Sequence, residues 1–259
     1  MISLDDRLVA EDVYRFGTTR IGWYVVADDE ALTVVDAGLP GHWRQLVDGV
    51  TDLGYELTAV EAVLLTHGDA DHVGIAEWLR RAVDAPVYLH PADADLACGG
   101  PPGLPPTALL RSLWRPATLA YVAEVIRSGV RRVPPLRTFE PIADGDVLDV
   151  PGRPRVVHLP GHTAGSCAFH FADHGVLCCG DAAFTLDVRT GEQTAPRVLP
   201  PIHYDAAQAR RSVQTLAEFG DAVLLPGHGD PWEGDVSAAG RTDTDAETIP
   251  GPTTPRGST

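Results

Sequence analysis

The chain has 259 residues, of which 44% are hydrophobic, and this is enough apolar material for the core of one large domain. Its formal net charge is −16, with 36 acidic residues against 20 basic ones, and every basic residue is arginine. Nucleic acid is therefore disfavoured as a partner, because phosphate backbones require concentrated positive charge. The sequence shows no basic stretch followed by an apolar one at its start and no apolar run long enough to span a bilayer, so we expect a cytoplasmic protein without membrane contact.

Short β-branched runs alternate with helical patterns, which favours a layered α/β architecture. In chain order, the patterns predict strands over 12–17, 21–27 and 31–36, a helix over 43–53, a strand over 60–65, a helix over 72–82 and a strand over 86–90. A mostly helical stretch over 107–128 follows, with a break at Pro116. The remaining predictions are strands over 147–150, 155–159, 166–171 and 175–179, a helix over 205–219 and a strand over 221–225.

These elements indicate one domain over residues 1–233 with a helical insertion over 98–140. The insertion carries one apolar face, formed by Leu119, Val122, Ala123 and Ile126, which fits either a packed helix pair or a lid over a pocket. From Gly234 onward the chain is poor in apolar residues and rich in Gly, Thr, Asp and Pro. This composition predicts a disordered tail over 234–259.

Four segments place histidine or aspartate directly after an apolar run. They are residues 66–72 (THGDADH), 161–166 (GHTAGS), 180–181 (GD) and 226–229 (PGHG). If the preceding strands end on the same edge of a sandwich, these side chains converge on one crevice. Imidazole and carboxylate together suit Zn²⁺, Mn²⁺ or Fe²⁺, and seven such groups are enough for two ions. The seven are His67, Asp69, Asp71, His72, His162, Asp181 and His228.

In order, spacing and context, the segments resemble the successive metal motifs of the metallo-β-lactamase superfamily, whose first motif is His-x-His-x-Asp-His. The similarity covers about residues 12–233 and implies a four-layer αββα sandwich with the site at one edge. It implies that His67 and His162 hold a first metal, that Asp71, His72 and His228 hold a second, that Asp181 bridges them, and that Asp36 orients ligands from behind.

One position departs from that motif, because Asp69 stands where the family has its second histidine. Three arrangements stay open: Asp69 binds the first metal directly, it binds through water, or the first site is weak or empty. A carboxylate is a harder ligand than imidazole, so Mn²⁺ and Fe²⁺ stay open beside the expected Zn²⁺.

The resemblance implies a hydrolase that acts on a small molecule with hydroxide generated between two divalent ions. Asp71 is the expected catalytic group, because it can orient that nucleophile and carry its proton. His203, in the loop after the bridging aspartate, is expected to contact substrate. Two other functions stay open: a mononuclear, iron-dependent enzyme similar to persulfide dioxygenases, and a non-catalytic metal-binding member of the fold.

Several substrate classes of the family fit poorly. Penicillin-type β-lactams are disfavoured because the sequence shows no export signal and no lysine for the substrate carboxylate, and a glutathione thioester because no basic C-terminal helical domain is evident. Phosphodiesters are disfavoured by the acidic charge. A small ester, lactone or thioester remains, and the sequence indicates no oligomeric state.

Overall fold

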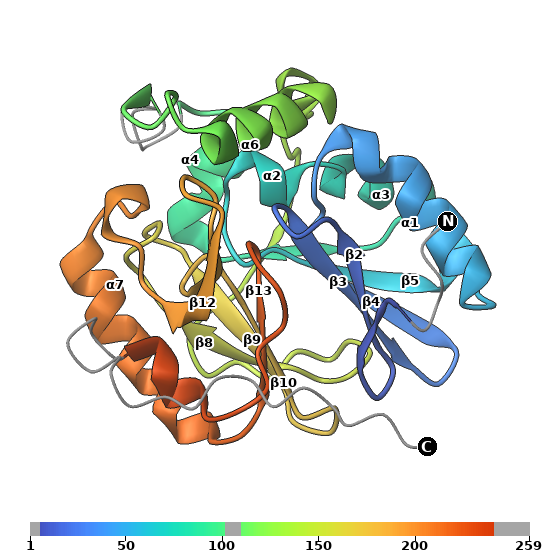
Figure 1. Ribbon diagram of the computed structural model, residues 1–259. Coiled ribbons are helices and arrows are strands. Elements are labelled where there is room, and N and C mark those ends of the chain that lie inside the picture. Colours follow the sequence, from blue (N-terminus) through green and yellow to red (C-terminus); the bar gives the residue numbers. More distant parts are fainter. Residues whose placement is uncertain (1–5, 102–109, 241–259) are drawn as a thin grey trace, which may run out of the picture.

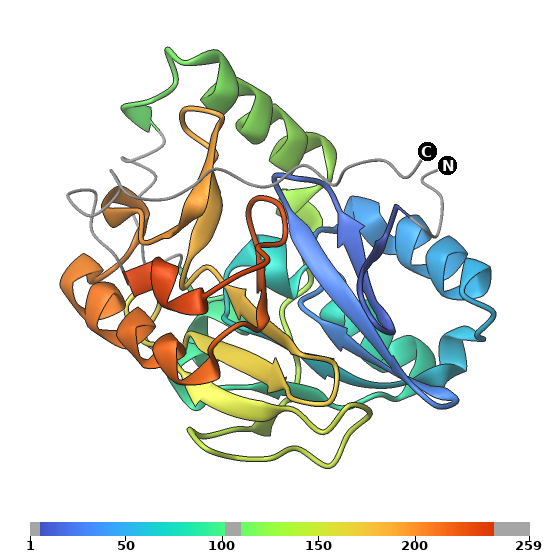
Figure 2. The same cartoon turned by 60° about the horizontal axis from the view of Figure 1, so that its bottom comes forward.

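The computed structural model describes residues 6–101 and 110–240. Two sheets pack face to face, and helices cover the outer face of each (Figures 1 and 2). This is the four-layer αββα sandwich that the sequence predicts. In the described part of the chain, no helix has both the length and the apolar character needed to cross a membrane.

The first sheet has seven strands in sequential order. They are β1 (Leu8–Ala10), β2 (Val13–Gly17), β3 (Gly22–Asp28), β4 (Ala31–Val35), β5 (Val60–Leu64), β6 (Val87–Leu89) and β7 (Glu140–Pro141). Strands β1 to β4 form an antiparallel meander, and β4 to β7 are parallel. The carboxyl ends of β4 and β5 therefore lie at one edge of this sheet.

The second sheet has the order β13-β10-β9-β8, formed by β8 (Arg155–His158), β9 (Cys167–Phe171), β10 (Val176–Gly180) and β13 (Val223–Pro226). Both β8 and β10 are antiparallel to β9, and β13 is parallel to β10, so β8, β10 and β13 all run in one direction. A separate hairpin, β11 (Phe184–Asp187) with β12 (Glu192–Arg197), follows the second sheet.

Alternation along the strands builds three apolar layers. In β3, Trp23 and Val25 face the helices while Tyr24 and Val26 face the other sheet, and all four are buried. The cluster between the sheets also takes Phe169 from the second sheet. A third cluster joins the outer face of that sheet to the C-terminal helical turns.

In residues 6–101 and 110–240, six α-helices surround the sheets. They are α1 (Trp43–Asp52), α2 (Ala70–Val73), α3 (Ala76–Val83), α4 (Ala94–Ala97), α6 (Pro116–Arg127) and α7 (Ala206–Ser212). Short 3-10 turns complete the description: η1 (Pro40–His42), η2 (Leu57–Ala59), η3 (Pro91–Asp93), η4 (Val130–Arg132), η5 (Pro200–Ile202), η6 (Val213–Phe219) and η7 (Val236–Gly240). Helices α1 and α3 cover the first sheet, and α7 lies on the side of the second (Figure 1).

The predicted helix over 72–82 is two helices, α2 and α3, separated by Gly74. A side chain at this position would collide with the chain that leaves β4, because a Cβ on Gly74 would lie 1.8 Å from the carbonyl oxygen of Gly38. This close contact brings α2 against the end of β4. The break in the helix therefore allows the loop after β5 to pack against the loop after β4.

Other boundaries also differ from the prediction. The expected strand over 147–150 is a loop with a single β-bridge from Val147 to Arg155, and the expected helix over 205–219 changes into the 3-10 turn η6 after Ser212. Strands β1, β7, β11 and β12 are additions to the predicted set. Part of the helical stretch expected over 107–128 lies outside the described residues, and α6 begins at Pro116.

The first described residues of the disordered tail expected over 234–259 include an ordered turn. Residues Val236–Gly240 form η7, in which Val236 and Ala239 are buried in the third apolar cluster. Residues 241–259 lie outside the described residues.

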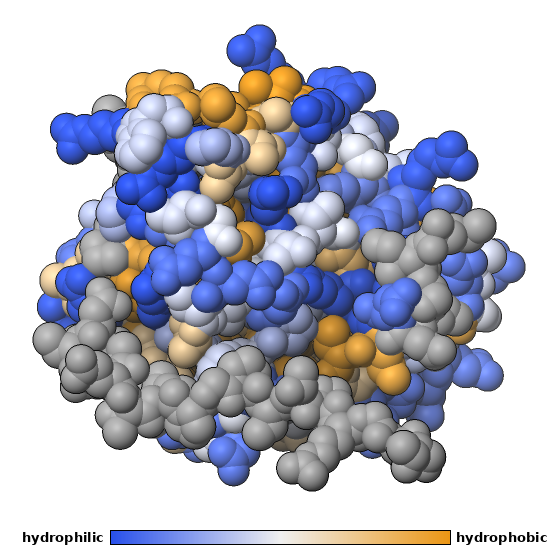
Figure 3. Space-filling view, in the orientation of Figure 1, coloured by the Kyte–Doolittle hydropathy of each residue, from blue (hydrophilic) through white to orange (hydrophobic). Residues whose placement is uncertain are grey.

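The outer face of the segment that contains α6 carries exposed apolar side chains. They are Leu110, Trp114, Leu119 and Ile126, and Figure 3 shows hydrophobic surface gathered in this region. Two of these, Leu119 and Ile126, belong to the face that the sequence pattern marks as apolar. Other residues of α6, which are Thr118, Tyr121 and Glu124, contact the rest of the protein.

We expect Val236→Ala to lower the free energy of unfolding by about 2 kcal/mol, because it leaves a cavity in the third apolar cluster. Urea unfolding of the whole chain measures this loss. The matched control is Val147→Ala, where the side chain is 59% exposed, and its effect should stay below about 0.5 kcal/mol. Equal midpoints for the two variants would show that η7 does not stabilise the fold.

Candidate metal centre

The polar motifs meet at one edge of the sandwich because five strands end there. Residues 66–72 follow β5, residues 161–166 follow β8, Asp181 follows β10, and residues 227–229 follow β13. Asp36 follows β4 directly. Strand direction in the two sheets therefore brings together side chains that are far apart along the chain, from Asp36 to His228.

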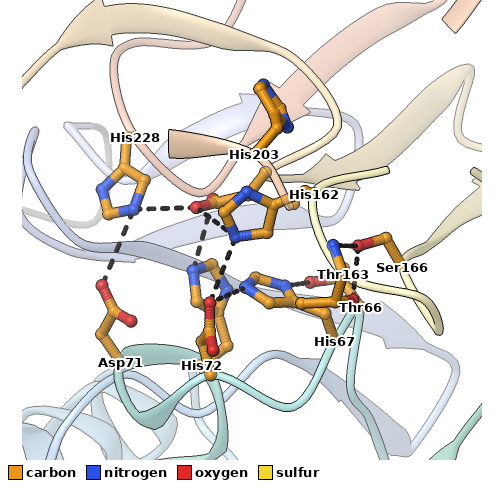
Figure 4. Close-up of polar contacts among 12 residues, drawn as sticks. Thr66, His67, Asp71, His72, His162, Thr163, Ser166, His203 and His228 are labelled. Atoms are coloured by element: carbon orange, nitrogen blue, oxygen red, sulfur yellow. Dashed lines mark hydrogen bonds and ion pairs between the residues drawn. The ribbon is translucent and has the colours of Figure 1, made fainter. Parts of the chain in front are cut away.

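A first group of ligand atoms comes from His67, Asp69 and His162. Oδ2 of Asp69 lies 3.2 Å from Nε2 of His162 and 3.7 Å from Nε2 of His67. In Figure 4 the rings of His67 and His162 face the same space. The three ligand atoms lie within 4.8 Å of one another, a separation that one metal ion can span.

A second group comes from Asp71, His72 and His228, whose ligand atoms also lie within 4.8 Å of one another. Asp181 stands between the two groups. Its Oδ1 lies 3.3 Å from Nε2 of His72, and its Oδ2 lies 3.2 Å from Nε2 of His228 and 3.5 Å from Nε2 of His162. The structure thus brings all seven predicted residues into one cluster.

Several polar atoms of this cluster are buried without a hydrogen-bond partner among the described residues. They include Nε2 of His67, Nε2 of His72 and Oδ1 of Asp181. Burying such atoms unpaired costs free energy, and buried polar groups are normally bonded. Atoms that face each other in two sets of nitrogen and oxygen donors fit divalent transition ions.

The remaining nitrogens of three histidines are held from outside the cluster. Nδ1 of His72 lies 2.8 Å from Asp36, Nδ1 of His67 lies 3.0 Å from the hydroxyl of Thr66, and Nδ1 of His228 contacts the carbonyl oxygen of Arg20. Such contacts fix the ring orientation, so that Nε2 points inward. Asp36 therefore lies behind His72, and its role in orienting metal ligands stays a prediction.

The electrostatics of the cluster follow from burial and from mutual attraction. Burial lowers the pKa of His67 well below its ordinary value. Burial acts in the same direction on His72 and His228, but carboxylates outweigh it: Asp36 and Asp181 hold the pKa of His72 well above its usual range, and Asp181 raises the pKa of His228 to about 9. Although burial opposes it, attraction to the histidines lowers the pKa of Asp181. A divalent ion would take the place of these protons.

Asp93 supports the cluster from a position that sequence reasoning missed. Its buried carboxylate accepts hydrogen bonds from the backbone nitrogens of Gly68 (2.9 Å) and Gly165 (2.7 Å) and from the hydroxyl of Thr163 (2.6 Å). These contacts tie the loop after β5 to the loop after β8. No local signal marks this residue, because it lies among other acidic residues in PADADL.

Gly227 shows why the last motif contains glycine before its histidine. A Cβ at this position would lie 2.4 Å from Cε1 of His72 and 2.5 Å from Oδ1 of Asp181. Any side chain there would therefore displace two of the candidate ligands.

Tyr121 is the second residue that the sequence did not indicate. It comes from α6, inside the predicted insertion, and its hydroxyl donates a 3.0 Å hydrogen bond to Oδ2 of Asp71. Its ring packs edge-on against His228. The same side of α6 is anchored by Thr118, which donates to the carbonyl of Arg189, and by the ion pair of Glu124 with Arg20. The insertion thus supplies part of the site.

His203 lies beside the cluster but is 5% exposed. Its Nε2 accepts a hydrogen bond from the backbone nitrogen of Leu199, and its ring is packed edge-on against that of His162 at 5.3 Å. Burial, together with His162, lowers its pKa to about 3. The position favours support of His162, and substrate contact by His203 stays a prediction.

The sandwich carries a cluster of His and Asp side chains at the strand ends that could hold metal ions. A sequence profile described as the metallo-beta-lactamase superfamily matches residues 20–228. The chain therefore belongs to the metallo-β-lactamase superfamily.

Curated relatives extend over most of the chain. The probable metallo-hydrolase YflN of Bacillus subtilis (strain 168) is 29% identical over 224 residues, which cover 80% of this chain and 79% of that protein. The uncharacterized protein ML0493 of Mycobacterium leprae (strain TN) is 31% identical over 220 residues, which cover 82% of this chain and 88% of the relative.

Solved structures share the fold. The metallo-beta-lactamase family protein TTHA1429 from Thermus thermophilus matches with a TM-score of 0.63 at 24% identity and covers 90% of this chain and 78% of its own. TTHA1623, solved in a di-iron-bound form, matches with a TM-score of 0.56 at 26% identity and covers 85% of this chain and 92% of its own.

We expect Tyr121→Phe to weaken binding of the second equivalent of metal about ten-fold while leaving the first nearly unchanged, since the lost hydroxyl supports Asp71 alone. Titration with a competing chelator measures both affinities. Tyr55→Phe is the matched control, because it removes a hydroxyl that donates to the carbonyl of Asp29 at the far end of the first sheet. An unchanged second affinity in Tyr121→Phe would show that this hydrogen bond does not position Asp71.

Proposed function

We propose that the protein is a hydrolase that uses two divalent ions to cleave a small ester, lactone or thioester. One observation supports this most directly: the ligand atoms form three overlapping groups, of which one joins Asp181 to His67 and His72, and polar atoms of the cluster have no hydrogen-bond partner among the described residues. Superfamily membership supports a metal-dependent, hydrolase-type function. The relative YflN is itself described as a probable metallo-hydrolase.

In this proposal His67, Asp69 and His162 would hold one ion, Asp71, His72 and His228 would hold the other, and Asp181 would be a ligand shared by the two groups. Two ions at such a site polarise the electrophile and lower the pKa of water enough to supply hydroxide near neutral pH. Zn²⁺ is the expected metal. Mn²⁺ and Fe²⁺ are included, because three carboxylates are a harder ligand set than the usual two and the similar protein TTHA1623 has been solved with two irons.

The protein's own side chains account for positioning and proton transfer. Asp69 and Asp71 are the accessible members of the cluster, with 26% and 16% of their side chains exposed, whereas His72 is only 1% exposed. Substrate therefore approaches from the side of these two aspartates. In the proposal Asp71 orients water and takes its proton, and the hydrogen bond from the hydroxyl of Tyr121 to this carboxylate supports that role.

We expect the purified protein to carry one to two equivalents of transition metal and to lose all esterase, lactonase and thioesterase activity on chelation. Elemental analysis, followed by a panel of phenyl esters, γ-lactones and acyl thioesters with Zn²⁺, Mn²⁺ or Fe²⁺ restored, measures both. Asp71→Asn keeps the volume of the side chain and should lower kcat at least about 100-fold, because it removes the proton acceptor.

Three outcomes of that experiment contradict the proposal in different ways. Hydrolysis that survives complete chelation excludes metal catalysis. Dioxygen consumption on a thiol substrate with iron, in the absence of hydrolysis, indicates the redox alternative. Metal binding without turnover of any kind indicates a binding protein.

The role of Asp69 has a separate test based on metal stoichiometry. We expect Asp69→Ala to lose the first ion, because His67 and His162 remain as its only unshared ligands, and Asp71→Ala to lose the second. Asp69→His should retain both ions and shift preference from Mn²⁺ toward Zn²⁺, since imidazole is the softer ligand. Competition titrations of the variants give the order of affinities. Two ions bound with undiminished affinity in Asp69→Ala would show that Asp69 is not a ligand.

A further inference from the structure

A cavity of about 430 Å³ lies against the metal centre on the side of Asp69. Three segments form its walls: the loop after β5 with the start of α2, the end of α4 with the turn after it, and the stretch after α6. Its volume falls within the range of small-molecule pockets. Asp69 belongs both to this lining and to the first group of candidate ligands, so the cavity and the reaction centre are neighbours.

The walls of the cavity are mainly apolar. Among the described residues, Asp69 and Cys98 are the only lining residues with an ionisable side chain, and the others are aliphatic residues, prolines or glycines. The aliphatic and proline side chains are Ala70, Val73, Leu96, Ala97, Val130, Val133, Pro134 and Pro135. An anionic group placed here would lose its hydration and meet no cationic side chain among the described lining residues. An uncharged, apolar group gains by leaving water.

Backbone contacts hold these walls in place. The nitrogen of Leu136 donates to the carbonyl of Ala97 at 2.9 Å, which fixes the stretch after α6 against the end of α4. The nitrogen of Gly68 donates to the carboxylate of Asp93 at 2.9 Å, which fixes the loop after β5 against the turn that precedes α4. The cavity is therefore bounded by connected segments of the protein.

We propose that this cavity binds the apolar acyl chain of the substrate while the reacting carbonyl lies at the metals. This inference rests on the proposed function, and it narrows the substrate class to esters, lactones or thioesters of aliphatic acids longer than acetate. Asp69 lies between the two regions, so the bond that is cleaved is adjacent to the first carbon atoms of the chain that the cavity receives.

The first test is a chain-length series with p-nitrophenyl esters from acetate to octanoate on the metal-loaded protein. The ratio kcat/KM should rise up to about four-fold for each added methylene, which corresponds to about 0.8 kcal/mol of burial. It should stop rising once the chain fills the cavity. Equal values of kcat/KM across the series would overturn the proposal.

Two variants change the size of the cavity without touching a candidate ligand. Val133→Phe fills it and should lower kcat/KM for octanoate about ten-fold while changing acetate less than about two-fold. Leu96→Ala enlarges it and should move the optimum to longer chains. Val147→Phe is the matched control, because this exposed valine lies outside the cavity lining. A Val133→Phe profile that matches that of Val147→Phe would contradict the proposal.

A binding measurement separates this inference from the proposed function. Titration calorimetry with 1-hexanol should show binding to the wild-type protein and at least about ten-fold weaker binding to Val133→Phe. If no ester is hydrolysed but hexanol binds in this pattern, the proposed function fails and the apolar site stands. If esters are hydrolysed without chain-length dependence and hexanol does not bind, the function stands and the acyl site is wrong.

Discussion

The geometry of the metal centre depends on the buried carboxylate of Asp36. This residue follows β4 with a left-handed backbone (φ 61°), and its side chain accepts hydrogen bonds from the backbone nitrogen and the hydroxyl of Thr66 and contacts Nδ1 of His72. Thr66 in turn contacts His67. One carboxylate thus orients two candidate ligands that lie on opposite sides of Asp181. The same carboxylate joins the end of β4 to the end of β5. The positions of the candidate ligands therefore depend on how these two strands pair.

Seven ionisable ligands in one mostly buried cluster oppose folding unless their charges are balanced. Mutual attraction works against burial here: Asp36 and Asp181 raise the pKa of His72, Asp181 raises the pKa of His228, and the histidines lower the pKa of Asp181. Metal ions compete with protons for the same nitrogen and oxygen atoms, so metal affinity and the protonation of the site are linked. The three carboxylates among the ligands strengthen attraction for any divalent cation, and the metal preference must then come from ligand hardness and geometry.

The convergence of the candidate ligands could be predicted from sequence because they follow apolar runs that end at the same edge, as His162 follows β8 and His228 follows β13. Asp93 and Tyr121 could not, since their roles depend on contacts with residues that are distant in sequence and their local patterns resemble an acidic loop and a surface helix. Helix boundaries failed where packing overrides propensity, as at Gly74, which separates α2 from α3. The apolar pattern of α6 did not indicate which side of the helix faces the protein. Leu119 and Ile126 of that pattern are exposed, and Tyr121 contacts the site through its hydroxyl.

The two parts of the site differ in how the fold supports them. The candidate ligands lie at the ends of strands whose side chains form the apolar layers, so their positions follow from the core. The supporting hydroxyl of Tyr121 comes from α6, and two of the three walls of the apolar cavity come from the end of α4 and the stretch after α6, which lie outside both sheets. A substitution such as Val133→Phe changes a wall without disturbing any strand end, whereas a substitution at Asp36 changes two ligands at once. The fold can therefore accept a different substrate by altering these outer segments while the same strand ends keep the chemistry.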